Sequence, residues 1–254
     1  MDFSDPRFLE IFFDIHRDLP REGPGSFDSA RRALALMPVL PDDCVVLDVG
    51  CGPGRQTIYL AQLTNGQITA VDNHQPFLDQ LTRSAAEHGF DHRITPLNAD
   101  MNHLDLPEQG FDLVWSEGAL YQMGFGNGLK SMMRFLKPGG YLAASEAVLL
   151  RDGKLPPEVW DIWKDEYPAI TTIENNLELI HEAAYEVIDH FTLPENDWLE
   201  EYYAPMEKRL DLLEQKYAGD PFALEMIQYS RKEIDDYRYY SDWYGYEFFI
   251  CRNG

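Results

Sequence analysis

The segment VVLDVGCGPGRQT, residues 45–57, constrains the fold more than any other part of the chain. Its apolar run, Val45–Val49, is typical of a strand that is buried on both faces, as in a parallel sheet covered by helices. Three glycines follow at alternate positions, and glycines in such an arrangement let the backbone approach a ligand closely. The segment therefore predicts a strand, a ligand-binding turn and then a helix.

Strands and helices alternate along most of the remaining sequence. Helical spacing of apolar residues separates the strands, and one predicted helix runs through Met132 and Leu136 until KPGG ends it. Pro96 either weakens the third strand or places it at an edge of the sheet. The alternation predicts an α/β fold with a mostly parallel, seven-stranded Rossmann-like sheet and helices on both faces. The other predicted strands are residues 67–72, 93–100, 111–118, 141–148, 185–194 and 243–252.

Two common glycine-rich sites do not fit the residues after the first strand. A phosphate-binding P-loop needs a lysine and a serine or threonine after its last glycine, but Arg55 and Gln56 follow Gly54. A dinucleotide fingerprint needs G-x-G-x-x-G, whereas this turn has G-x-G-x-G. An acid two residues before the first glycine also favours a ligand that carries an amino group over a pyrophosphate.

The acid and the G-x-G-x-G turn together resemble motif I of the class I S-adenosylmethionine (SAM) methyltransferases. The order of LDVGCGPG, VD, AD, FDLVWS and LKPGG is similar to the small-molecule branch of that family, which includes quinone-biosynthesis C-methyltransferases. The resemblance covers about residues 40–150 and extends more loosely to the later strands. It implies SAM as the cofactor and S-adenosylhomocysteine (SAH) as its product.

The resemblance also implies which residues hold the cofactor. Asp48 would orient the methionine end, Asp72 would accept from both ribose hydroxyls, and Asp100 would accept from the adenine amino group. Taken singly, each of the last two acids is also typical of a cap or a turn, but three consecutive strand ends meet at one edge of the sheet. The implied cofactor set is Asp48, Gly50, Gly52, Gly54, Asp72, Asn73, Asp100, Met101 and Ser116.

We expect the 254 residues to form a single domain. Residues 1–40 form an N-terminal helical arm or lid, in which Asp5 caps a helix and REGPGS, residues 21–26, breaks it as a hinge or an ordinary turn. Residues 41–150 form the SAM-binding half. Residues 151–254 form the substrate-side half, with a helical insertion at about 195–240 before the last strand.

Catalytic residues are harder to predict, because methyl transfer depends mainly on aligning the acceptor with the methyl group. A base is needed only where the acceptor must lose a proton. Glu117 and Tyr121 are the first candidates, since they lie at the ligand-facing end of the fourth strand, and His16 on the arm is the second. Each of these residues is also typical of a capping or surface group.

The segments expected to hold the acceptor are rich in aromatic residues. They predict an aromatic lid over an apolar or cationic acceptor, although rings at these positions also commonly pack the core. The aromatic residues in question are Phe12, Phe13, Tyr121, Trp160, Trp163, Trp198, Tyr202 and Tyr203.

The formal net charge of −23 disfavours nucleic acids and anionic membranes as partners. The loop WSEGALYQMG also lacks the Asp/Asn-Pro-Pro-aromatic tetrapeptide of amino-methyltransferases that act on nucleic-acid bases. No cysteine or histidine spacing predicts a metal site. The acidic start MDFSDPRFLE has no signal-peptide pattern, and no apolar run is as long as a membrane span, so we expect a cytoplasmic protein.

The sequence therefore predicts a SAM-dependent methyltransferase with a small-molecule acceptor. A non-catalytic SAM- or SAH-binding sensor is the main alternative, and an NAD-dependent oxidoreductase is disfavoured by the incomplete fingerprint. The identity of the acceptor and of the methylated atom does not follow from the sequence. The aromatic tail DDYRYYSDWYGYEFF packs either into the sheet, which we favour, or into the seam of a homodimer.

Overall fold

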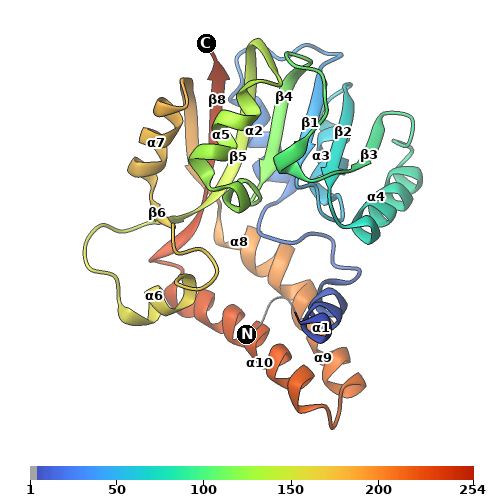
Figure 1. Cartoon of the computed structure of the whole chain (residues 1–254), viewed down its shortest axis with the longest axis vertical. Coiled ribbons are helices and arrows are strands. Elements are labelled where there is room, and N and C mark those ends of the chain that lie inside the picture. Colours follow the sequence, from blue (N-terminus) through green and yellow to red (C-terminus); the bar gives the residue numbers. More distant parts are fainter. Residues whose placement is uncertain (1–4) are drawn as a thin grey trace.

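The computed structural model describes residues 5–254 as one sheet covered by helices, with a further group of helices beyond one edge (Figure 1). Residues 1–4, the start of the acidic N-terminal segment, lie outside the described residues. The strands are β1 (Val45–Val49), β2 (Gln67–Asp72), β3 (Ile94–Asn98), β4 (Phe111–Glu117), β5 (Leu136–Leu149), β6 (Thr171–Thr172), β7 (Tyr185–Thr192) and β8 (Tyr244–Asn253).

Helices cover both faces of the sheet, and a third group lies beyond the carboxyl ends of the parallel strands (Figure 1). Short helical turns η1 (Met101–His103), η2 (Leu120–Met123) and η3 (Leu199–Tyr203) connect some of them. The helices are α1 (Pro6–His16), α2 (Phe27–Ala35), α3 (Arg55–Leu63), α4 (Gln75–His88), α5 (Phe125–Met133), α6 (Pro157–Trp163), α7 (Ile173–Glu182), α8 (Glu195–Trp198), α9 (Ala204–Lys216) and α10 (Pro221–Tyr240).

The sheet has the strand order β3-β2-β1-β4-β5-β8-β7, and the short β6 pairs with β5 beside this path. All neighbours are parallel except β8, which runs antiparallel to both β5 and β7. The predicted fold class is therefore confirmed. Pro96 lies in β3, an edge strand where a missing backbone donor is tolerated. The aromatic tail enters the sheet as β8.

Each face of the sheet has its own apolar core. Residues of α2, α3 and α4 pack with Ile68 and Trp115 on one face, and residues of α5 and α7 pack with Leu47 and Val114 on the other. Because β1 contributes to both cores, it is apolar almost throughout. This arrangement leaves the carboxyl ends of the parallel strands free to form a site.

The arm and the insertion form a third apolar core of their own. Ile11 and Ile15 of α1 pack with residues of α6, α9 and α10, and Asp14 of α1 accepts hydrogen bonds from Arg209 and Lys216 of α9. Figure 1 shows these helices together at the lower end of the molecule, beyond the carboxyl ends of the parallel strands. The N-terminal helix and the helices at 204–240 thus lie together beyond the carboxyl edge of the sheet.

The predicted boundary between the helix through Met132 and the following strand was wrong. Helix α5 ends at Met133, and β5 begins at Leu136, so that KPGG lies inside the strand instead of ending the helix. Leu136 is fully buried and pairs with Phe111 before the register shifts. Burial of this leucine against β4 therefore places the start of β5 before KPGG.

Candidate active site

The glycine turn at the end of β1 forms the floor of the site. The backbone N–H groups of Gly50 and Cys51 both donate to the carbonyl of Val71, each at 2.9 Å. Gly50 has a φ of +72°, and a Cβ atom there would lie 2.4 Å from the Cβ of Ala119. Only glycine fits such a left-handed position beside another chain segment, so the turn can pass directly beside Ala119.

Asp72, at the end of β2, holds this turn in place. Its Oδ2 accepts from the backbone N–H of Gly52 at 2.9 Å, and its Oδ1 accepts from the backbone N–H of His74 at 2.8 Å. Each carboxylate oxygen can accept more than one hydrogen bond. Asp72 can therefore still accept from the hydroxyl groups of a ligand.

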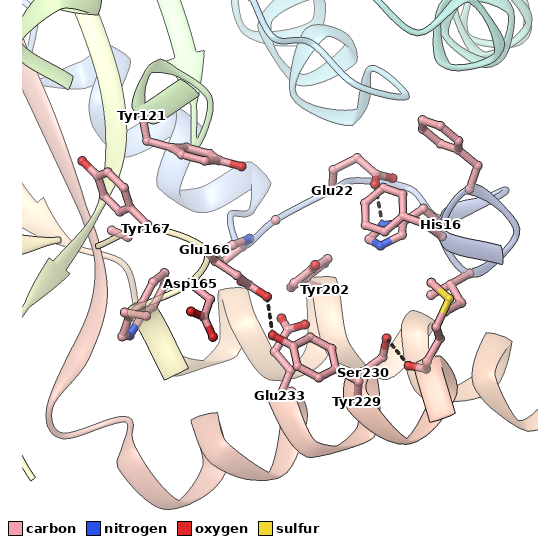
Figure 2. Close-up of a pocket in the computed structure, with 18 of the residues that line it drawn as sticks. His16, Glu22, Tyr121, Asp165, Glu166, Tyr167, Tyr202, Tyr229, Ser230 and Glu233 are labelled. Atoms are coloured by element: carbon pink, nitrogen blue, oxygen red, sulfur yellow. Dashed lines mark hydrogen bonds and ion pairs between the residues drawn. The ribbon is translucent and has the colours of Figure 1, made fainter. Parts of the chain in front are cut away.

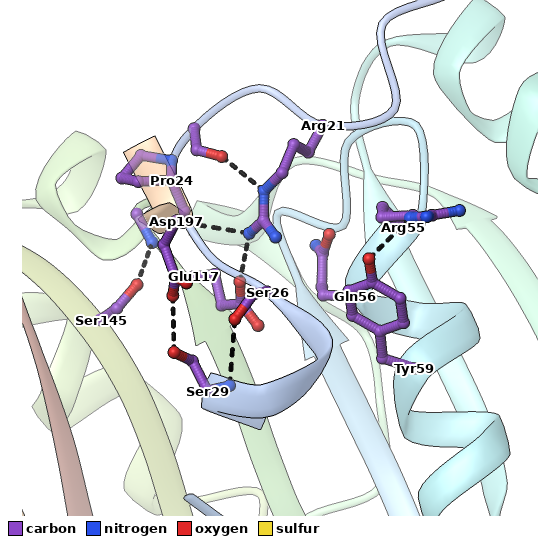
Figure 3. A network of polar contacts seen from close by, with 12 residues as sticks. Arg21, Pro24, Ser26, Ser29, Arg55, Gln56, Tyr59, Glu117, Ser145 and Asp197 are labelled. Atoms are coloured by element: carbon purple, nitrogen blue, oxygen red, sulfur yellow. Dashed lines mark hydrogen bonds and ion pairs between the residues drawn. The ribbon is translucent and has the colours of Figure 1, made fainter. Parts of the chain in front are cut away.

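The linker between α1 and α2 contributes a buried arginine that faces β4 (Figure 3). The side chains of Arg21 and Glu117 are only 3% and 5% exposed, and Arg21 Nη2 lies 2.5 Å from Glu117 Oε2. Glu117 also accepts from the indole N–H of Trp115 at 2.9 Å. Among the described groups, Arg21 Nη1 has no hydrogen-bond partner although it is buried. The site thus holds one free, buried cationic donor.

Further hydrogen bonds fix the same linker to the insertion. The backbone N–H of Gly25 donates to the carbonyl of Asp197 at 3.3 Å, and the Ser29 hydroxyl donates to the Asp197 carboxylate at 2.5 Å (Figure 3). Ser26 caps α2 by accepting from the backbone N–H of Ser29. REGPGS therefore connects the arm, β4 and α8 through defined bonds.

A cavity of about 250 Å³ lies between the glycine turn, the end of β2 and the linker. Arg21 and Gln56 also line it. Five of the nine residues in the predicted cofactor set line this cavity: Gly50, Gly52, Asp72, Asn73 and Met101.

Three others, Asp48, Gly54 and Ser116, lie behind the cavity wall and support it. Asp48 is fully buried and accepts from the Thr57 hydroxyl at 2.6 Å, and burial raises the pKa of its carboxyl to about 7. The Ser116 hydroxyl donates to the carbonyl of Val49 at 2.9 Å. Gly54 begins α3 with a φ of +90°. These residues shape the turn and do not line the cavity themselves.

Asp100 is not among the residues that line this cavity. Its Oδ1 accepts from both the backbone N–H and the side-chain amide of Asn102, each at 2.8 Å. The carboxylate therefore caps the short helix η1, because a free N–H at a helix start needs an acceptor. Met101, which follows it, is the residue that reaches the cavity.

A second cavity of about 870 Å³ continues from the first (Figure 2). Two residues of the predicted aromatic lid, Trp160 and Tyr203, do not line this larger cavity. Trp160 is 44% exposed, and Tyr203 is packed in the helical core. Predicted aromatic residues that do line it are Phe12, Phe13, Tyr121, Trp163, Trp198 and Tyr202. Residues shared by the two cavities are Phe12, Phe13, His16, Glu22, Gly23, Pro24, Tyr121 and Tyr246.

The three predicted catalytic residues line one or both cavities, and they differ in their contacts. Glu117 lines the smaller cavity, but its carboxylate is held by Arg21. Tyr121 lines both cavities, and burial, together with the nearby Glu146 carboxylate, raises the pKa of its hydroxyl. His16 also lines both, and its Nδ1 lies 2.6 Å from Glu22 Oε2. Burial disfavours the charged His16 ring, but the Glu22 carboxylate outweighs it and raises the pKa.

The sequence analysis did not identify Arg21, Glu22 or Glu233 as site residues. Arg21 and Glu22 lie in a segment that was interpreted only as a hinge or a turn, and no motif spacing connects them to β4. Glu233 lies in the middle of α10, where an acid normally faces solvent. Only the packing of the arm and the insertion against the sheet brings Arg21 to the smaller cavity, Glu233 to the larger one, and Glu22 to both.

This strand order, with a glycine turn after β1 and an acid after β2, defines the fold of the class I SAM-dependent methyltransferases. Residues 46–140 match the model of the methyltransferase domain family. Residues 46–140 are therefore similar to a methyltransferase domain, and the fold is the one that the sequence predicted.

Two curated proteins that resemble part of the chain are methyltransferases by name. It is 36% identical over 121 residues to malonyl-[acyl-carrier protein] O-methyltransferase of Pseudescherichia vulneris, covering 47% of this chain and 43% of that one. It is 28% identical over 102 residues to sterol 24-C-methyltransferase of Aspergillus fumigatus, covering 40% and 27%. The chain thus matches less than half the length of these two curated relatives.

A solved structure shows the same fold along nearly the whole chain. The SAM-dependent methyltransferase from Geobacter sulfurreducens, in complex with SAH, superposes with a TM-score of 0.83 at 18% identity, covering 96% of this chain and 98% of that one. Within residues 5–254, no helix combines the length and apolar character needed to span a membrane. The same residues contain no group of three histidine, cysteine or acidic side chains placed to hold a metal ion.

Proposed function

We propose that the protein is a SAM-dependent methyltransferase that transfers a methyl group to a small-molecule acceptor. The observation that carries this proposal is the pair of joined cavities at the carboxyl edge of the sheet, one against the glycine turn and one against the helical layer. A donor in the first lies directly beside an acceptor in the second. The larger cavity has the volume of a typical small-molecule site.

The residues of the smaller cavity fit the cofactor's chemical groups. Asp72 offers a carboxylate to the ribose hydroxyls, and Gly50 and Gly52 line the cavity with backbone alone, which allows close approach of a ligand. The unpartnered Nη1 of Arg21 suits the carboxylate of the methionine part, since guanidinium groups pair strongly with carboxylates. Asn73 and Met101 complete the adenosine side. Asp48, Gly54, Ser116 and Asp100 would then act indirectly, by holding the turns.

When bound, SAM supplies an electrophilic methyl group on a sulfonium, whose carbon–sulfur bond breaks as the bond to the acceptor forms, leaving SAH. The protein's part is to align the acceptor and exclude water. Tyr121 and His16 line the junction and are the groups that can orient the acceptor or hold a departing proton. Glu117 serves instead as the buried partner of Arg21.

Calorimetry with SAM, SAH and NAD tests the cofactor assignment directly. We expect SAM and SAH to bind and NAD not to bind, because the turn lacks the third dinucleotide glycine. Transfer of a labelled methyl group into a mixture of small metabolites then tests catalysis. Binding of NAD without SAM would overturn the proposal.

We predict that Asp72→Asn weakens SAH binding by about 1–3 kcal/mol, because charge-assisted hydrogen bonds to the ribose are lost. Asp91→Asn, an exposed substitution in the loop before β3, is the matched control and should leave the affinity unchanged. Both are measured by titration calorimetry, with thermal unfolding to check that each variant is folded. Equal affinities of the two variants would remove Asp72 from the site.

The alternative is a protein that binds SAM or SAH without catalysis. The ion pair between Glu117 and Arg21 favours it, because that pair removes the most obvious base from the reaction. This alternative predicts tight SAH binding with no methyl transfer to any acceptor pool. Turnover of the labelled methyl group would rule it out.

A further inference from the structure

The larger cavity has an unusual charge pattern for a space enclosed by aromatic rings. Four acidic residues line it, Glu22, Asp165, Glu166 and Glu233. No lysine or arginine is among its lining residues in the described part of the chain, and His16 is the only basic group, already paired with Glu22. The walls therefore present net negative charge to whatever enters.

Two of these acids are brought together by the segment after α6 and by α10. Glu166 accepts a hydrogen bond from the Tyr229 hydroxyl at 2.6 Å, and Glu233 accepts one from Tyr203 at 3.2 Å. Figure 2 shows the side chains of Glu166 and Glu233 close to each other in the same part of the cavity. Burial raises the pKa of Glu233 to about 7, and repulsion from Glu166 adds to the rise. A positive charge placed there would relieve this repulsion.

An aromatic residue with a free hydroxyl faces the same space. Tyr202 is only 7% exposed, lines the cavity, and makes no hydrogen bond within the described residues. In Figure 2 it lies between Glu22 and Glu233. Rings of this kind attract cations through their electron-rich faces, and more strongly where water is excluded. A neutral ligand would gain less from the carboxylates than a cation, and an anionic ligand would be repelled by them.

We propose that the methyl acceptor is a small cationic molecule whose ammonium group binds between the carboxylates of Glu233 and Glu166, beside the ring of Tyr202. The assignment rests on the proposed function, since it treats this cavity as the acceptor site. The rest of the acceptor lies along the aromatic wall toward Tyr121, where the two cavities meet.

Three probes that share one aromatic ring and differ in their head-group charge test this assignment. Tyramine carries an ammonium group, 2-(4-hydroxyphenyl)ethanol a neutral hydroxyl, and 4-hydroxyphenylacetate a carboxylate. Titration calorimetry of the full chain, with and without SAH, should show tyramine binding at least about tenfold more tightly than the alcohol. The carboxylate should bind least. Equal binding of tyramine and the alcohol, tighter binding of the carboxylate, or no binding of any probe would overturn the proposal.

A pair of variants on α10 assigns the effect to the cavity. Glu233→Gln should weaken tyramine binding about tenfold and leave binding of the alcohol unchanged. Glu225→Gln, an exposed substitution on the same helix, should change neither. If both variants bind tyramine like the wild type, the ammonium site is not at Glu233 and the proposal fails.

The same titrations separate this inference from the proposed function. SAH binding without a preference for tyramine would contradict the cationic acceptor and leave the methyltransferase assignment intact. A preference for tyramine that depends on Glu233 in a protein that binds neither SAM nor SAH would contradict the proposed function alone.

Discussion

Arg21→Met is expected to lower the free energy of unfolding by about 3–5 kcal/mol, because it leaves the Glu117 carboxylate buried and unpaired. The side chains of both residues are at most 5% exposed, so bulk water replaces the lost partner poorly. The substitution also removes the only unpartnered guanidinium donor in the smaller cavity. We therefore expect weaker SAH binding in addition to lower stability.

A second variant separates these two effects. In Arg21→Met/Glu117→Gln the buried charge is gone, and most of the lost stability should return, as measured by urea unfolding. SAH binding should stay weak, because the donor is still missing. Arg31→Met, which breaks an exposed ion pair with Asp28, is the matched control and should change stability by less than about 1 kcal/mol. A loss at Arg21 no larger than at Arg31 would contradict the buried ion pair.

Glu146→Gln is expected to stabilise the protein at alkaline pH. Glu146 is fully buried in β5, and burial raises its pKa to about 8, although hydrogen bonding to the Tyr167 hydroxyl and to the Ala147 backbone partly opposes the rise. The folded protein therefore retains a proton that the unfolded chain releases near its ordinary pKa. Stability falls between about pH 4.5 and pH 8, since the unfolded state binds fewer protons in that range.

The neutral amide removes this penalty. Because one pKa unit corresponds to about 1.4 kcal/mol, the gain for Glu146→Gln at pH 8.5 is on the order of 5 kcal/mol, and it should be close to zero at pH 4.5. Urea unfolding at both pH values measures it. Glu186→Gln, an exposed change on β7, should show no such dependence. The same gain at both pH values would mean that Glu146 titrates normally.

The sequence predicted the sheet well because its signals are local. Val45–Val49 is apolar because both faces of the sheet are covered, and glycines must follow where the turn has positive φ angles. Capping at Asp5 is equally local. The boundary near Leu136 was missed because its burial against Phe111 depends on a strand more than twenty residues earlier, which outweighed the turn signal of KPGG.

The site was only partly predictable because much of it depends on tertiary packing. Asp72 could be found because it ends a strand next to the glycine turn. Arg21 and Glu117 are separated by 96 positions, and Glu233 reaches the cavity only because α10 packs beneath the sheet edge. Asp100 fits the expected spacing, and its Oδ1 accepts two hydrogen bonds from Asn102 at the start of η1. Sequence spacing predicts where a strand ends, but it does not predict what the side chain at that position contacts.

A crystal structure of the protein with SAH tests the central claim most directly, because it locates donor and acceptor spaces together. We predict that the ribose hydroxyls lie within hydrogen-bonding distance of Asp72, that the SAH carboxylate faces Arg21, and that the sulfur points toward the larger cavity beside Tyr121. SAH bound elsewhere, or with its sulfur directed away from that cavity, would contradict the account.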